Sequence, residues 1–145
     1  MGRILALDIG DKRIGVALSD PTHLIAPPLG VYERVGYGPD TRYMSRLCAE
    51  NDVELIVCGL PYNMDGSRGF QAEKAVAFAE KLREAGMTIA YQDERLTTVS
   101  AHEALTEGGV RREARKGTVD KIAAALILQG YLEAQGQARE SAFIE

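Results

Sequence analysis

The sequence has no apolar run long enough to cross a membrane. The longest, Ile122–Leu128, has seven residues, whereas a membrane-spanning helix needs about 20. The chain opens with Met1-Gly2-Arg3 and leads directly into a strand-like segment, which is not the pattern of a signal peptide. A myristoylation site is also excluded, because Ala6 stands where that signal requires serine or threonine. We therefore expect a cytoplasmic protein that does not bind membranes.

Cysteine and histidine are both scarce. The two cysteines, Cys48 and Cys58, are not in the spacing of a metal site and fall in segments expected to be a helix and a strand. This placement is typical of reduced, buried cysteines. His23 and His102 also lack a partner at metal-ligand spacing, so we expect structural or surface roles for them. The sequence therefore favours no metal site built from cysteine or histidine.

Charge is unevenly distributed along this chain of 145 residues, whose apolar fraction of 46% is that of an ordinary globular domain. The net charge of −4 argues against a protein that coats polyanions in general. A local basic cluster nevertheless offers contacts to phosphate groups. It consists of Arg111, Arg112, Arg115, Lys116 and Lys121, offset by Glu113 and Asp120.

Apolar patterning predicts the element order β-β-β-α-β-α-β-α-α. Strands are expected at residues 3–9, 14–19, 25–33, 54–59 and 88–92, and helices at 40–51, 71–85, 99–106 and 118–133. Residues 10–13 have the composition of a hairpin turn, and Pro27-Pro28 suggests an irregular or edge strand.

This order predicts an α/β domain with a mixed five-stranded sheet and helices on both faces, as in the ribonuclease H fold. We expect one domain over residues 1–135 and a frayed tail over residues 136–145.

Asp8 is the first candidate for chemistry, because it ends the apolar strand that contains Ile4 and Leu7. A carboxylate in this place is costly unless it is paired or binds a cation. The same position also suits a residue that only caps the turn. A strand followed by Asp-x-Gly and a hairpin also opens the actin-like sugar kinases. Those enzymes close two domains over a nucleotide, whereas this chain has room for one, so that alternative is disfavoured.

Two further carboxylates stand where ligands commonly gather. Glu94 follows the strand at 88–92, and ligands of open α/β sheets bind at strand ends. The adjacent Asp93 could take its place, although in an extended chain the two would point to opposite sides. Asp120 lies in the first turn of an expected helix that is apolar nearly all round. Glu94 and Asp120 could each instead be acidic residues that stabilise a helix N-terminus.

The three carboxylates share a chemical logic. Mg²⁺ prefers oxygen ligands, commonly one or two carboxylates together with water and phosphate. Hydrolysis of a phosphodiester by two metal ions places those ions about 4 Å apart. Acidic groups from distant positions that meet at one sheet edge would suit this chemistry. The hypothesis is a two-metal site held by Asp8, Glu94 and Asp120.

Several segments could contact the nucleic-acid backbone. Lys12 and Arg13, in the turn after Asp8, are either a solvated hairpin tip or phosphate contacts. The glycine-rich segment 59–69 could bind a phosphate through backbone amides, or it could be an ordinary turn. The arginine-rich segment 108–117 could be a solvated loop or a clamp on nucleic acid. The expected contacts are Lys12, Arg13, Arg95, Arg111, Arg112, Arg115 and Lys116.

Four motifs together resemble the YqgF/RuvX family of pre-16S ribosomal RNA nucleases, also described as Holliday-junction-resolvase-like. The resemblance runs from about Ile4 to Leu132. The motifs are LDIGDKRIGVALSD (Leu7–Asp20), GLP (Gly59–Pro61), DERLTT (Asp93–Thr98), and VDKIAA (Val119–Ala124) followed by LILQ (Leu126–Gln129).

This resemblance implies a ribonuclease H-like fold and an active site of Asp8, Glu94 and Asp120 that uses Mg²⁺ or Mn²⁺. It also implies trimming of the 5′ end of precursor 16S ribosomal RNA in the cytoplasm. We expect the protein to be a monomer or weak homodimer. Two alternatives stay open. One is a Holliday-junction resolvase, which would act as a dimer on branched DNA. The other is a non-catalytic module that binds nucleic acid.

Overall fold

The five strands form one mixed sheet. The computed structural model describes residues 2–61, 65, 69–93 and 122–135. The strands are β1 (Arg3–Ile9), β2 (Arg13–Leu18), β3 (Pro28–Glu33), β4 (Val53–Leu60) and β5 (Ile89–Asp93). Their order in the sheet is β3-β2-β1-β4-β5. The pairs β1–β2 and β2–β3 are antiparallel, and β1–β4 and β4–β5 are parallel. The expected mixed five-stranded sheet is confirmed, with β1 at its centre.

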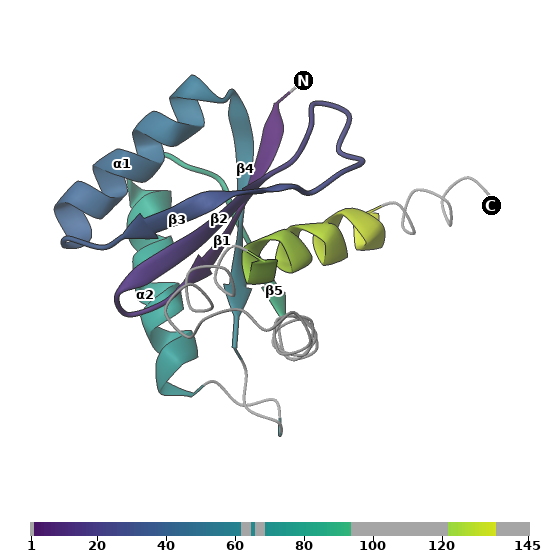
Figure 1. Cartoon of the computed structure of the whole chain (residues 1–145). Coiled ribbons are helices and arrows are strands. Elements are labelled where there is room, and N and C mark those ends of the chain that lie inside the picture. Colours follow the sequence, from purple (N-terminus) through teal and green to yellow (C-terminus); the bar gives the residue numbers. More distant parts are fainter. Residues whose placement is uncertain (1, 62–64, 66–68, 94–121, 136–145) are drawn as a thin grey trace, which may run out of the picture.

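Helices cover both faces of this sheet, as expected. The helices α1 (Tyr37–Glu50) and α2 (Phe70–Glu84) lie on one face, and the helical residues 122–135 lie across the other (Figure 1). None of the described helices is long and apolar enough to span a bilayer. The expected helix at 99–106 and the expected tail at 136–145 lie outside the described residues.

Strand alternation divides the core into two clusters. On the α1/α2 face, Leu5 and Leu7 of β1 pack with Phe78 of α2. On the other face, Ile4 and Ala6 of β1 pack with a cluster from the helix at 122–135. Since both faces are covered, β1 is apolar from Ile4 to Leu7, up to Asp8. The members that this helix contributes to the cluster are Ala124, Ile127 and Leu128.

The last helix is buried along one side, rather than all round as its apolar sequence suggested. Ala124, Ile127 and Leu128 are inaccessible to solvent, while Gln129 and Glu133 are exposed. The small alanine side chains allow the helix to approach the sheet closely without enclosing it. The helix therefore covers one face of the sheet and contributes only its inward side to the core.

Among the elements from β1 to β5, two boundaries differ from the prediction by three residues, and the others by at most one. Helix α1 begins at Tyr37 and not at Asp40, because Pro39 is tolerated in a first turn, where backbone N–H groups have no partner within the helix. The third strand begins at Pro28 and not at Ile25. The segment before it is held by Asp20, whose carboxylate accepts hydrogen bonds from the Leu24 and Ile25 N–H groups at 2.8 and 2.9 Å.

Candidate functional site

Asp8 lies on the face of the sheet that the last helix covers. It is half-buried near the end of β1, and it shares that face with Ile4 and Ala6 by strand alternation. Its partner on β2 is Gly15. On β4, Leu7 pairs with Cys58, which is followed by Gly59. Glycine therefore stands on both neighbouring strands beside Asp8, and neither position adds a side chain that would pack against the carboxylate.

Residues near the end of β5 alternate between the two faces of the sheet. Ala90 packs on the face of Asp8. Gln92 lies on that face too, since a Cβ atom on Gly130 of the covering helix would lie 3.3 Å from its Nε2 atom. Asp93 is exposed and pairs with Leu60, which belongs to the core on the opposite face. The structure therefore disfavours Asp93 as a partner of Asp8.

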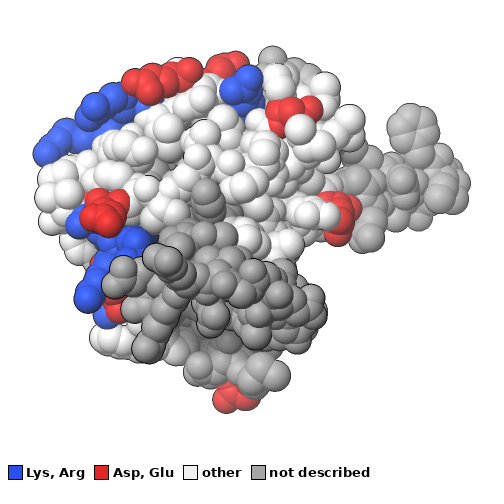
Figure 2. Space-filling view, viewed as in Figure 1, with Lys and Arg blue, Asp and Glu red and all other residues white. Residues whose placement is uncertain are grey.

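The remaining predicted site residues lie outside the described part of the chain. They are Glu94, Arg95, Arg111, Arg112, Arg115, Lys116 and Asp120. Within the described residues, no group of three or more histidine, cysteine or acidic side chains could hold a metal ion. On the described surface of the face in Figure 2, basic and acidic side chains are interspersed and do not form one basic area.

The hairpin after Asp8 is rigidly closed. The Gly10 N–H donates to the Arg13 carbonyl oxygen at 2.9 Å. A Cβ atom on Gly10 would lie only 2.8 Å from that oxygen, so this position requires glycine. Lys12 is exposed at the tip, and its carbonyl oxygen accepts a hydrogen bond from the Arg34 N–H at 2.9 Å. The predicted phosphate contact Lys12 is thus solvent-accessible, while Arg13 is half-buried.

A buried ion pair next to this hairpin escaped the sequence prediction. Asp40 is inaccessible to solvent and accepts hydrogen bonds from the Tyr32 hydroxyl at 2.8 Å, Arg34 Nε at 3.0 Å and the Val35 N–H at 2.9 Å. Burial alone would raise the pKa of Asp40, but the hydrogen bonds from Val35, Arg34 and Tyr32 outweigh it and lower that pKa. Arg34 Nη1 also donates to the Gly10 carbonyl oxygen at 3.0 Å. The pair therefore connects the start of α1 to the turn after Asp8.

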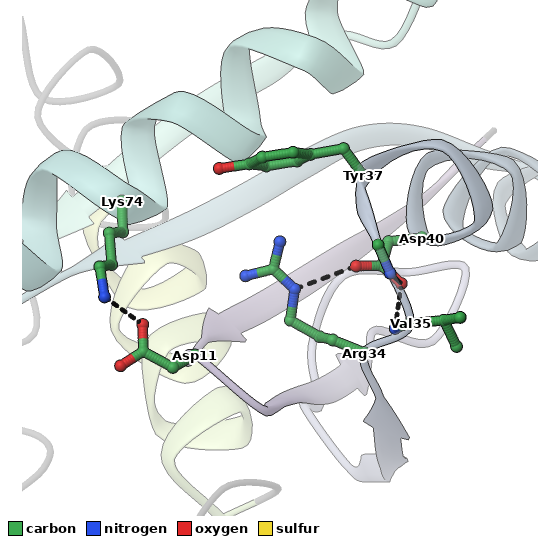
Figure 3. Close-up of a pocket in the computed structure, with 7 residues that line it drawn as sticks. Asp11, Arg34, Val35, Tyr37, Asp40 and Lys74 are labelled. Atoms are coloured by element: carbon green, nitrogen blue, oxygen red, sulfur yellow. Dashed lines mark hydrogen bonds and ion pairs between the residues drawn. The ribbon is translucent and has the colours of Figure 1, made fainter.

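Beside this ion pair lies a pocket of about 340 Å³ (Figure 3). Its walls come from the β1–β2 hairpin, the segment between β3 and α1, and α2, which contribute Asp11, Arg34 and Lys74 among others. Lys74 Nζ lies 2.9 Å from Asp11 Oδ1. Hydrogen bonds from Lys74 and then from Gln71 lower the pKa of Asp11. The pocket lies on the face of the sheet that α1 and α2 cover, where Leu5 and Leu7 of β1 also pack. Asp8 alternates with these two residues along the strand, so it lies on the opposite face.

The cysteines and His23 have the structural roles that were expected. Cys58 is buried and Cys48 half-buried, both as free thiols. Burial raises the pKa of Cys58 to about 12 and that of Cys48 to about 11. His23 Nε2 lies 2.6 Å from the Gly2 carbonyl oxygen and ties the loop after β2 to the start of the chain. His102 lies outside the described residues.

Part of the long N-terminal motif is also structural. Ser19 is buried, and its Oγ atom accepts a hydrogen bond from the Ile4 N–H at 2.9 Å. The Asp20 carboxylate organises the following loop by accepting hydrogen bonds from backbone N–H groups, foremost that of Ile25. These hydrogen bonds lower the pKa of Asp20 well below its ordinary value. The Ser-Asp end of the motif thus fixes β2 and its exit, while Asp8 and the hairpin form the candidate site.

Comparison with known proteins agrees with this architecture. A family model described as RuvX, Holliday junction resolvase, matches residues 2–134. A Clostridium acetobutylicum protein named "Putative pre-16S rRNA nuclease" is 47% identical over 131 residues, which cover 90% of this chain and 97% of that protein. A protein of the same name from Clostridioides difficile is 45% identical over 133 residues, covering 91% and 94%.

Solved structures share the fold at low sequence identity. The RuvC protein of T. thermophilus, solved with a Holliday junction substrate, aligns with a TM-score of 0.58 at 16% identity, covering 92% of this chain and 95% of that one. A fowlpox virus resolvase, solved with Holliday junction DNA, aligns with a TM-score of 0.55 at 12% identity, covering 92% and 98%. These likenesses confirm the ribonuclease H-like fold. With the family model matching nearly the whole length and relatives near half identity, the chain belongs to the RuvX family.

Proposed function

We propose that this protein is a metal-dependent nuclease that hydrolyses RNA phosphodiester bonds and trims the 5′ end of precursor 16S ribosomal RNA in the cytoplasm. One observation of the structure carries the proposal. Asp8 is a half-buried carboxylate at the end of the central strand, with glycine beside it on both neighbouring strands. The relatives named as pre-16S rRNA nucleases support the choice of substrate.

The proposed catalytic set is Asp8, Glu94 and Asp120. In the sequence, Glu94 is two positions after Gln92, which lies on the face of Asp8. Asp120 is two positions before Ile122, where the described part of the covering helix begins. These sequence positions favour acidic partners for Asp8 from that strand and that helix.

The chemistry at Asp8 fits Mg²⁺ or Mn²⁺. Carboxylate oxygens are the ligands that these ions prefer, and Gly15 and Gly59 add no side chain beside the Asp8 carboxylate from the two neighbouring strands. Asp8 would hold both ions of a two-metal site, with Glu94 on one and Asp120 on the other. When bound, such ions lower the pKa of a water nucleophile and stabilise the leaving oxygen. The exposed Lys12, with Arg13, Arg95 and the segment 111–116, would hold the RNA backbone in place.

Parallel assays on RNA and branched DNA test this function against its alternatives. The purified protein is incubated with Mn²⁺ and either a labelled precursor of 16S ribosomal RNA or a four-way DNA junction. We expect the RNA to lose its 5′ extension and the junction to stay intact. Paired cuts in the junction with intact RNA would instead establish the resolvase alternative. If neither substrate is cut, the protein is the non-catalytic module.

The basic segment gives a prediction about binding. Changing Arg111, Arg112 and Arg115 together to glutamine should reduce the magnitude of the negative slope of log affinity against log salt by about 2, because each phosphate contact to a single strand contributes about 0.7. Fluorescence anisotropy with labelled RNA measures this slope. Changing Arg42 and Arg46, which are exposed on α1, serves as the control and should leave the slope nearly unchanged. An unaltered slope in the triple variant would show that the segment is only solvated.

A further inference from the structure

One exposed aromatic ring, that of Tyr37, lines the pocket on the α1/α2 face, and a second, that of Phe70, lies against the lining residue Lys74. Phe70 is 73% exposed at the start of α2, and Tyr37 is 46% exposed at the start of α1. Both rings lie next to cations. Lys74 Nζ is 4.1 Å from the centroid of Phe70, and Lys81 Nζ is 5.0 Å from that of Tyr37. Two large rings exposed in this way lose the benefit of burial, so they suggest a surface that is covered in a complex.

Two cations face each other across the pocket. Figure 3 shows Arg34 and Lys74 on opposite walls, with one terminal nitrogen of Arg34 directed toward Lys74 and the other toward the Tyr37 ring. Arg34 Nε is held by Asp40 and Nη1 by the Gly10 carbonyl oxygen, which fixes the guanidinium in place. Asp40 also lines the pocket, but its carboxylate is fully buried and already accepts hydrogen bonds from Tyr32, Arg34 and Val35. The guanidinium therefore keeps free N–H groups for an anion at little conformational cost.

Lys74 can exchange partners more easily. Its ion pair with Asp11 is exposed, with 39% and 48% of the two side chains accessible. Such pairs are weak, so a phosphate can compete for the ammonium group. Lys81 adds a further positive charge near Tyr37 and has no carboxylate at ion-pair distance among the described residues. The pocket thus combines the fixed guanidinium of Arg34, the ammonium group of Lys74, which can change partners, and the exposed ring of Tyr37.

We propose that this pocket holds one unpaired nucleotide of the RNA substrate, with a phosphate between Arg34 and Lys74 and a base stacked on the open side of Phe70. Aromatic stacking together with cationic contacts to phosphate is the general chemistry by which proteins hold single strands. A base inside a duplex has both faces covered by its stacked neighbours, so it cannot stack on this ring. The ligand class is therefore a single-stranded nucleotide within a chain.

The site extends the proposed nuclease function and rests on it. The pocket and Asp8 lie on opposite faces of the sheet but at the same end of β1, and the Gly10 carbonyl oxygen belongs to the turn between them. Lys12 is exposed at the tip of that turn. An RNA strand that passes over the hairpin would reach both sites. The pocket would then hold an unpaired nucleotide at a distance from the phosphodiester bond that is cleaved.

A double variant and a matched control test this site in the full chain. Phe70→Ala with Lys74→Gln removes one exposed apolar side chain and one cation at the pocket. Leu24→Ala with Arg46→Gln makes the same two losses elsewhere on the exposed surface. Circular dichroism establishes that both variants fold. Binding is measured by anisotropy with a labelled single-stranded RNA of about ten nucleotides, which spans the site size of typical single-strand-binding folds, and with a blunt RNA duplex.

We expect the pocket variant to bind the single strand about 10- to 100-fold more weakly than the wild type, the range of a lost stacking contact. Its duplex affinity and the control's affinity for both RNAs should change by less than about twofold, because exposed single charges contribute little. Equal single-strand affinity in the two variants would overturn the site. So would an equal loss for single strand and duplex, because that result describes a general electrostatic surface.

Two further arms separate the possible sources of failure. A nucleoside 5′-monophosphate should displace the single strand only weakly. Displacement at concentrations comparable to those of the strand would mean that the pocket binds free nucleotides, and this would overturn the proposal.

Cleavage of the precursor by the wild type is measured alongside. If the wild type cuts the precursor while the pocket variant binds like the control, only the pocket proposal fails. A wild type that neither binds nor cuts RNA contradicts the nuclease function as well.

Discussion

Changing Asp8 to asparagine is expected to slow cleavage of the precursor RNA by about 10²- to 10³-fold or more, the scale of losing one preorganised electrostatic group from an active site. Asparagine has nearly the same shape but lacks the negative charge that a divalent cation requires. Asparagine also keeps the shape of this half-buried side chain, so the variant should fold with a melting temperature close to that of the wild type. Single-turnover cleavage and thermal unfolding of the same preparation measure the two effects.

A carboxylate at the other end of the sheet provides the control for Asp8. Asp52 is exposed just before β4, which runs parallel to β1, so it lies at the end of the sheet opposite Asp8. Its φ of 53° is a conformation that asparagine also adopts readily. Asp52→Asn should therefore cut RNA at the wild-type rate. Unchanged cleavage by Asp8→Asn, with both variants folded, would contradict the catalytic role of Asp8.

Changing Asp40 to asparagine is expected to lower the free energy of unfolding by about 3 kcal/mol, the scale of breaking one partner out of a buried ion pair. Asparagine removes the charge that compensates Arg34 and places an N–H group where a hydrogen-bond acceptor is required. For a domain of this size, the melting temperature should fall by about 10 °C. Urea unfolding of the wild type and the variant gives the difference directly.

The exposed ion pair nearby is the matched control for Asp40. Asp11 also pairs with a cation, Lys74, but both side chains are largely accessible to water. Solvent screens such pairs, so Asp11→Asn should be nearly as stable as the wild type. Equal stability of the two variants would show that the Asp40–Arg34 pair does not anchor the start of α1.

The pH dependence of stability follows from the lowered pKa of Asp40. Its carboxyl group has a lower pKa in the folded than in the unfolded protein, where it is about 3.9. The ionised carboxylate therefore contributes its full stabilisation above about pH 4, and this contribution is lost as the pH falls through the lowered folded pKa. The stability difference between the wild type and Asp40→Asn should be largest near neutral pH and shrink in acid. A difference that grows toward acid would have the wrong sign.

The fold could be predicted from the sequence because its signals are local. The order of the strands and the first two helices follows from alternation and from apolar runs, and β1 is apolar on both faces because both faces are covered. The start of α1 was placed three residues too late, although proline fits a first helical turn and Pro39 lies in that turn. The partial exposure of the last helix depends on how one face of the sheet is covered, which its own sequence does not encode.

The candidate site could be predicted only in part. Asp8 stands out because a carboxylate interrupts a buried strand, and this is visible in the sequence. The Asp40–Arg34 pair was missed because six positions separate the two residues and no periodicity relates them; the turn between β3 and α1 brings them together. The pocket was missed for the same reason, since the hairpin and α2 contribute its walls from distant parts of the chain.

Asp93 is the last residue of β5, and Glu94 follows it in the sequence. Substitutions of these two residues test most directly the central claim, which is that catalysis takes place on the face of the sheet that carries Asp8. Asp93 lies on the opposite face, and Glu94 is the next residue in the sequence. The measurement is single-turnover cleavage of the labelled precursor RNA with Mn²⁺ by Glu94→Gln and by Asp93→Asn. The account predicts that Glu94→Gln retains less than about 1% of the wild-type rate, while Asp93→Asn cuts like the wild type. Loss of cleavage in Asp93→Asn with normal cleavage by Glu94→Gln would contradict it.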